Sequence, residues 1–153
     1  MKGFYQISQA IKDQLDADVF VNTVTIGDIF KIDLNKQTIF PLSHIMINSA
    51  NYNGSTFNYN ISVLCMDIVD ESKEETTDLF RGNDNEQDVL HTQEMVARRL
   101  LEMLNRGDLY DDGFQLSNSS ASIEYFVDRF ENKIAGVTIT FDVNTFNDMT
   151  ICD

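Results

Sequence analysis

An alternating stretch between residues 56 and 66 constrains the fold of this chain more than any other feature. Every second position is apolar, at Phe57, Tyr59, Ile61, Val63 and Cys65. The positions between them are polar as far as Ser62, and apolar again at Leu64 and Met66. Because successive side chains of a strand point to opposite faces, the pattern predicts a strand whose second face is covered only near its end.

A turn signal directly before this strand predicts a hairpin. Asn53 and Gly54 both tolerate positive φ, and such a pair favours a tight connection between two strands. The preceding segment, residues 43–50 (SHIMINSA), follows Pro41, which can begin a strand without removing a central ladder hydrogen bond. We expect these two segments to pair in antiparallel fashion.

Two segments have the spacing of amphipathic helices. The first begins near residue 4, and its apolar stripe consists of Phe4, Ile7, Ile11 and Leu15. The second starts after Asp84 or Asn85 and runs to about residue 105, and Gly107 is expected to stop it. Its stripe consists of Val89, Val96, Leu100 and Leu104, widened by Ala97 and Leu101.

Shorter segments with strand character complete the order of elements. Residues 19–26 are β-branched, and residues 29–34 alternate in the manner of a half-buried strand. Alternation returns at residues 123–127 and 135–143, with residues 131–133 as the turn between them. The order α-β-β-β-α-β-β predicts the α+β class, with a single antiparallel β-sheet of four to five strands and two main helices packed on one face.

The length and composition of the chain predict a single domain with a strong negative charge. A chain of 153 residues with 42% hydrophobic content can close one core, so we expect residues 1–153 to form one domain. Lys and Arg number 11 against 25 Asp and Glu, a net charge of −14, and residues 70–86 form an acidic excursion that we expect to be partly mobile. This surplus argues against a protein that grips phosphate backbones. It suits solubility, a basic partner, or a position near DNA without adhesion.

Nothing in the sequence indicates a membrane segment, a disulfide framework or a cofactor. No run approaches the roughly 18 apolar residues of a membrane span, and the first residues lack the apolar core of a secretory signal. We therefore expect a protein that is made in a cytoplasm and does not enter a membrane. Cys65 and Cys152 belong to no CxxC or CxxH pattern, so neither a disulfide nor a zinc site is indicated.

Motifs of catalysis are largely missing. The chain has no GxGxxG, P-loop or GxSxG sequence, and His44 and His91 stand apart from any partner at motif spacing. Asp67, Asp70 and Glu71, at the end of the clearest strand, are candidates for the site of a metal-dependent hydrolase. A second set of acidic residues could hold a calcium ion: Asp78, Asp84, Glu86 and Asp88. This set does not have the residue order of an EF-hand loop. Acidic residues in a charged stretch are more commonly a solvated surface, so we expect neither enzyme activity nor a bound metal.

The order and wording of five segments resemble the tail-terminator and tail-completion proteins of tailed bacteriophages, small ring-forming proteins of the head–tail junction. The segments are FYQISQAIKDQL, FPLSHIMINSA, FNYNISVLCMDIVDESKE, HTQEMVARRLLEMLNRGD and YFVDRFENKIAGVTITFDVN. Together they span nearly the whole chain, and the similarity is one of architecture rather than of a catalytic signature. The acidic stretch of residues 70–88 departs from the more compact members of the family.

This resemblance implies a non-enzymatic virion protein that forms a homo-oligomeric ring, typically a hexamer, around the path of the DNA. The ring would terminate the tail tube and contact neck or connector proteins. Some of five acidic residues would line or face the channel and let DNA pass with little adhesion: Asp70, Glu71, Glu74, Glu75 and Asp78. Contacts between subunits or with neighbours would fall in residues 48–55 and 144–153, at Asn51, Tyr52, Asn53, Phe146, Met149 and Ile151. The plainer interpretation of both segments is an ordinary surface loop and a frayed end.

Two other classes of function remain open on sequence grounds. An acidic binding module, acting as a DNA mimic or as an inhibitor of a basic partner, would stay monomeric or dimeric and bind in a salt-sensitive way. A metal-dependent hydrolase would need a divalent metal at Asp67, Asp70 and Glu71, and would lose turnover in Asp67→Asn. The ring protein, in contrast, is expected to assemble and to show no turnover.

Overall fold

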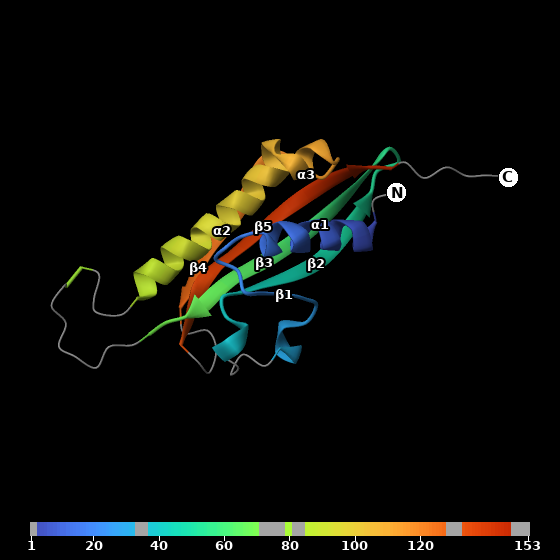
Figure 1. Cartoon of the computed structure of the whole chain (residues 1–153). Helices are drawn as coiled ribbons and strands as arrows, with labels where there is room; N and C mark the ends of the chain where they lie inside the picture. The colour runs from blue at the N-terminus through green and yellow to red at the C-terminus, as the bar shows by residue number, and fades with distance from the viewer. Residues whose placement is uncertain (1–2, 33–36, 71–78, 81–84, 128–132, 148–153) are drawn as a thin grey trace.

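In the computed structural model, one five-stranded sheet carries its two main helices on a single face (Figure 1). The structure describes residues 3–32, 37–70, 79–80, 85–127 and 133–147. The helices are α1 (Phe4–Asp16), α2 (Glu86–Arg106) and the short α3 (Asp108–Asp111). The strands are β1 (Thr23–Ile26), β2 (Leu42–Tyr52), β3 (Thr56–Ile68), β4 (Gln115–Val127) and β5 (Ile134–Phe146). Their order across the sheet is β1-β2-β3-β5-β4.

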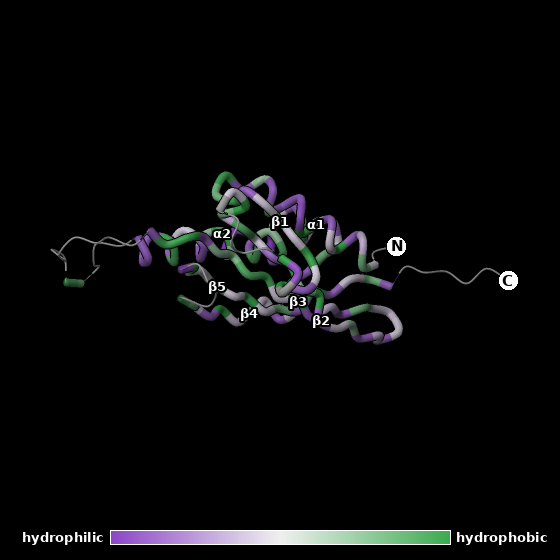
Figure 2. The backbone as a smooth tube through the Cα atoms, turned by 90° about the horizontal axis from the view of Figure 1, so that it is seen from below, coloured by the Kyte–Doolittle hydropathy of each residue, from purple (hydrophilic) through white to green (hydrophobic). Residues whose placement is uncertain are grey.

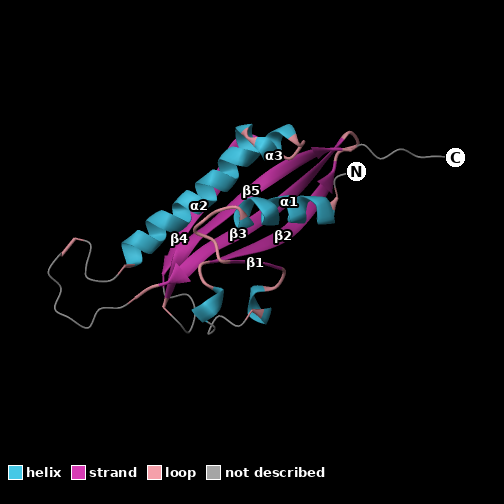
Figure 3. Ribbon diagram, in the orientation of Figure 1, coloured by secondary structure: helices cyan, strands magenta, loops and turns pink. Residues whose placement is uncertain are grey.

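The predicted α+β class and order of elements are confirmed, with one difference in the sheet (Figure 3). The sheet is not wholly antiparallel, because β1 pairs with β2 in parallel register, from Thr23 opposite Leu42 to Ile26 opposite Ile45. A parallel neighbour needs a long connection that returns the chain to the same end of the sheet, and residues 27–41 supply it. The sheet is therefore mixed, with antiparallel pairing everywhere except at this edge.

The predicted hairpin is formed by β2 and β3. Their pairing runs from Leu42 opposite Met66 to Tyr52 opposite Phe57, with one irregularity after Ile47. Gly54 has a φ of +78°, the left-handed conformation that glycine adopts without strain. β2 begins directly after Pro41, as the sequence predicted.

The two faces of the sheet are buried in different ways. Seen from below, α1 and α2 lie together on one side of strands β2 to β5 (Figure 2). On that side Ile61, Val63 and Cys65 of β3 are fully buried in the main core with both helices. On the opposite side Leu64 and Met66 join a second cluster, as the interrupted polar pattern predicted. This second face is thus apolar at one end of β3 and polar at the other.

The segment that covers this second cluster was predicted wrongly as a strand at residues 29–34. Residues Ile29–Lys31 form a 3₁₀ turn instead, and a second such turn spans Gln37–Ile39. Ile29 and Ile32 pack against the second cluster, and residues three apart share one side of a 3₁₀ turn. Residues 33 and 34 of the predicted strand lie outside the described residues. Alternation over so few positions does not distinguish a strand from such a turn.

The central pair of strands, β3 and β5, approaches very closely at Gly136. A Cβ atom at this position would lie 2.0 Å from the carbonyl oxygen of Cys65 and 2.8 Å from the Cα of Met66. On the other side of β5, Phe126 of β4 stands opposite Gly136 and is buried. Because backbone atoms of β3 occupy the position of a Cβ, only glycine fits here.

Helix α2 begins and ends close to the predicted residues. Asn85 is its N-cap residue, but its side-chain oxygen accepts the backbone N–H of Asp70 at 2.7 Å rather than one from the helix. Gly107 ends the helix in an extended conformation, and its N–H donates to the carbonyl of Met103 at 3.2 Å. The chain then enters α3 at once, which holds the apolar Leu109 against the main core.

Candidate interaction surfaces

Four of the residues predicted to make contacts between subunits meet at one end of the sheet. Asn51 and Tyr52 are exposed at the end of β2, and Asn53 opens the turn. Phe146 ends β5 opposite Thr56, beside the same turn. Two hydrogen bonds from Asn147 hold the end of β5 beside the turn. The backbone N–H of Asn147 donates to the carbonyl of Ser55 at 2.8 Å, and its side-chain amide donates to the carbonyl of Gly54 at 2.7 Å. We call this region the hairpin end; Met149 and Ile151 lie outside the described residues.

Two aromatic side chains are exposed at the hairpin end. Tyr52 is 69% exposed and Phe146 is 63% exposed. Tyr52 contacts Phe57 edge to face, with ring centroids 5.4 Å apart, and Phe57 stacks on the buried Tyr59 at 6.5 Å. These preferred ring arrangements connect the exposed ring of Tyr52 to the buried Tyr59. Tyr59 belongs to the main core, on the apolar face of the strand that the alternation predicted.

Strand β4 forms an open edge of the sheet, interrupted by a large bulge. Leu116 pairs with Val143 and Ala121 with Phe141, so residues 117–120 stand opposite a single residue of β5. Asn118 and Ser119 in this bulge have φ values of 55° and 50°. Bulges interrupt regular pairing along an edge strand, so the longer regular stretch of β4 is residues 121–127.

The polar half of the second sheet face is a network of amide and hydroxyl groups. Its members are Asn48, Asn58, Asn60, Ser62, Thr140, Asp142 and Asn144. The amide of Asn58 donates to Asn144 at 2.6 Å, and that of Asn60 donates to Asp142 at 3.0 Å. The sequence predicted the polar face of β3 but not these partners, because they depend on the register of β3 with β5.

The residues predicted to line a channel are described only in part. Asp70 is exposed at the end of β3, and its backbone N–H is bound by Asn85. The other four lie outside the described residues: Glu71, Glu74, Glu75 and Asp78.

The same region held the predicted hydrolase and calcium sites. Asp67 is half-buried, its Oδ1 accepts the N–H of Ile68 at 2.8 Å, and burial raises the pKa of its carboxyl group. Glu86 faces Lys133 at 3.7 Å in the first turn of α2, where Asp88 is exposed. Within the described part of the chain, no three His, Cys, Asp or Glu side chains are placed to hold a metal ion.

Nearly every described cation is already neutralised by a carboxylate. Six lysines and arginines lie in the described residues, and five of them make ion pairs. The pairs are Lys12–Asp16, Arg98–Glu94, Arg99–Asp18, Arg106–Glu102 and Lys133–Glu86. Lys31 is the remaining one. The described part of the chain therefore offers phosphate groups almost no free positive charge.

His44 and Cys65 are buried rather than placed for chemistry. His44 lies between β1 and β2, with Nδ1 2.7 Å from the hydroxyl of Thr25 and Nε2 2.7 Å from the carbonyl of Gly27. Because a carbonyl can only accept, Nε2 carries the proton and Nδ1 accepts from Thr25. Burial lowers the pKa of His44 and raises the pKa of the Cys65 thiol to about 12. Both groups are therefore held in their neutral forms at neutral pH.

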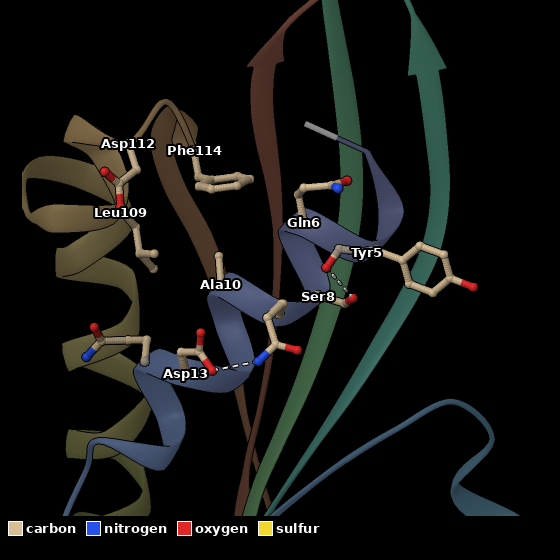
Figure 4. Close-up of a pocket in the computed structure, with 10 residues that line it drawn as sticks. Tyr5, Gln6, Ser8, Ala10, Asp13, Leu109, Asp112 and Phe114 are labelled. Carbon is tan, nitrogen blue, oxygen red and sulfur yellow. Dashed lines mark hydrogen bonds between the residues drawn. The ribbon is translucent and has the colours of Figure 1, made fainter. Parts of the chain in front are cut away.

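A groove between α1 and α3 was not predicted from the sequence. It has a volume of about 830 Å³, and Leu109 and Phe114 point toward α1 from its far wall (Figure 4). Its ten lining residues are Tyr5, Gln6, Ser8, Gln9, Ala10, Asp13, Gln14, Leu109, Asp112 and Phe114. The signal in the sequence was weak, because the four residues of α3 are too few to show a helical period.

In the described residues, no helix is both long enough and apolar enough to cross a membrane. No protein-family model matches this sequence, and a comparison with curated proteins finds no significant match.

Proposed function

We propose that this chain is a structural virion protein that forms a homo-oligomeric ring at the head–tail junction of a tailed phage. In this role it terminates the tail tube and joins it to the neck while DNA passes through. The resemblance of its segments to tail-terminator and tail-completion proteins suggests this class. The observation that carries the proposal is the presence of two different surfaces suited to docking, the hairpin end and the open edge of β4.

A closed ring needs such a pair of surfaces. Each subunit must present one surface to the copy before it and a different one to the copy after it. The hairpin end offers exposed aromatic rings, and β4 is the outermost strand on its side of the described sheet. Exposed aromatic anchors and free strand edges are both common elements of protein interfaces.

The charge of the chain fits a position close to DNA without binding to it. Contacts with phosphates depend on free lysine and arginine side chains, and five of the six described cations are engaged by carboxylates. The net charge of −14 adds repulsion at a distance. In this proposal Asp70 and the acidic residues after it contribute to the negative surface of the channel.

The oligomeric state tests this proposal directly. Native mass spectrometry and negative-stain microscopy of the full chain, alone and with the tail-tube protein of the same phage, should reveal a ring. The double variant Tyr52→Ser, Phe146→Ser should weaken assembly by more than tenfold, because truncating an anchor residue costs roughly 2 kcal/mol or more. Val19→Ser is the matched control, since Val19 is 88% exposed but lies far along the chain from the hairpin end.

Two outcomes would contradict the ring. A chain that stays monomeric under all these conditions and binds a basic protein in a salt-sensitive way would favour the acidic binding module. Turnover of a substrate that is lost in Asp67→Asn would favour the hydrolase.

A further inference from the structure

We infer that the α1–α3 groove binds a peptide segment of a partner protein that carries Lys or Arg beside an apolar anchor. This inference goes beyond the ring and does not depend on it, because every residue of the groove belongs to a single chain. It rests on the shape of the groove, on its charge and on the polar groups of its wall.

The shape suits an apolar anchor. Leu109 and Phe114 are buried members of the main core whose side chains reach the groove, and Ala10 faces them from α1 (Figure 4). Tyr5 also lines the groove and is 82% exposed. A volume of about 830 Å³ lies within the range of sites that enclose a small ligand or a few side chains.

The charge suits a cation. Asp13 on α1 and Asp112 after α3 occupy the two walls, and none of the ten lining residues is basic. The cation next to Asp13 in sequence, Lys12, instead binds Asp16 at 2.6 Å. A positively charged group in the groove would therefore meet two carboxylates that no lining residue neutralises. Complementary charge of this kind also favours basic partners over acidic ones.

The wall of α1 suits a peptide backbone. Gln6, Gln9 and Gln14 line the groove with carboxamide groups, which can both donate and accept hydrogen bonds. Gln9 uses its NH₂ group to hold Asp13 at 2.7 Å, which leaves its carbonyl oxygen available for an N–H of the occupant. Amides, carboxylates and an apolar floor together match a short basic peptide better than a simple metal ion or an apolar ligand.

Charge also excludes two other occupants. Residues 148–153 of this chain (DMTICD) contain two acidic residues and no base, so the groove would repel them. A phosphate group of nucleic acid would be repelled for the same reason.

Fluorescence anisotropy with a rhodamine-labelled probe peptide, acetyl-Arg-Leu-Leu-Arg amide, tests this inference on the full chain. We expect saturable binding that weakens as salt is added, and no binding of the acidic counterpart acetyl-Glu-Leu-Leu-Glu amide. Asp13→Asn and Asp112→Asn should each weaken binding by about fivefold, since an exposed charge pair contributes up to about 1 kcal/mol. Asp111→Asn is the matched control, because it removes the same charge next to Asp112 but outside the groove.

Three results would overturn the inference. They are equal binding of both peptides, equal loss in Asp111→Asn and Asp112→Asn, or competition by spermidine at the same concentration as by the unlabelled basic peptide. The last result would mean that any cation suffices. Anisotropy reports peptide binding whether the chain is a monomer or a ring. The prediction of a ring and the prediction of peptide binding can therefore be disproved separately.

Discussion

The guanidinium group of Arg99 in α2 holds the carboxylate of Asp18, which follows α1, through two hydrogen bonds. Nε lies 2.6 Å from Oδ2, and Nη2 lies 3.0 Å from Oδ1. The side chain of Asp18 is only 5% exposed and also accepts the backbone N–H of Phe20 at 3.0 Å. Arg99 lies over the ring of Phe20, 5.7 Å from its centroid. One side chain thus ties the second main helix to the connection between α1 and β1.

Replacing Arg99 by Met should lower the free energy of unfolding by about 1–2 kcal/mol, because the buried carboxylate of Asp18 loses its partner. The loss is limited because the side chain of Arg99 is itself partly exposed to solvent. Urea denaturation measures this change. Arg106→Met is the control; its partner Glu102 is more than half exposed, so the expected change is within about 0.5 kcal/mol. A double variant Arg99→Met, Asp18→Asn completes the cycle. If its loss of stability equals the sum of the losses of the two single variants, the two side chains are not coupled.

Gly136→Ala should lower the free energy of unfolding by about 3 kcal/mol or more, because the added methyl group collides with the backbone of β3 rather than with a movable side chain. Gly54→Ala separates this effect from backbone strain. Gly54 has positive φ but nothing within 4 Å of an added Cβ, so its expected loss is only about 1–2 kcal/mol. Equal losses at the two positions in thermal or urea unfolding would disprove the close approach.

Gln93→Met should raise the free energy of unfolding by about 1–2 kcal/mol. Gln93 is 1% exposed on the buried face of α2, and neither its amide nitrogen nor its oxygen has a hydrogen-bond partner among the described residues. An unsatisfied buried amide is destabilising, and methionine has nearly the same shape without the polar atoms. Gln9→Met, on the exposed side of α1, should change stability by less than about 0.5 kcal/mol. A loss of stability in Gln93→Met would mean that a bound water satisfies the amide.

The stability of the fold should fall as the pH drops below about 6.5, because of His44. Burial lowers the pKa of His44 in the folded chain, while the unfolded chain keeps the ordinary value of 6.5. Between these two pKa values the unfolded state binds more protons, so the free energy of unfolding rises with pH in that window and is lost as the pH falls through it. Urea titrations of the wild type and His44→Gln across this range isolate the effect, and parallel pH profiles would refute it.

Local patterns predicted the strands and helices that carry their own period. The alternation of β3, the turn at Asn53 and Gly54, and the stripe of α2 were each sufficient to place an element. The parallel pairing of β1 was not predictable, because its four residues have a weak pattern and their partner lies beyond a long connection. The same holds for the hairpin end. Its two segments were each predicted as contact regions, but the sequence did not show that they lie side by side. Their meeting depends on the register of Thr56 with Phe146.

The pairing of β3 with β5 also determines how the chain must behave while the ribosome makes it. Thr56 to Ile68 can form a hairpin with β2 at once, but its other edge waits for Ile134 to Phe146. Synthesis of the 78 residues from Val69 to the end of β5 at Phe146 takes about 4–16 s at ~5–20 residues per second. During that interval the nascent chain exposes an apolar strand with one open edge, and the next residues to emerge are the strongly acidic 70–86. Charges that directly flank such a strand oppose aggregation, so we expect this acidic run to limit aggregation of the incomplete chain.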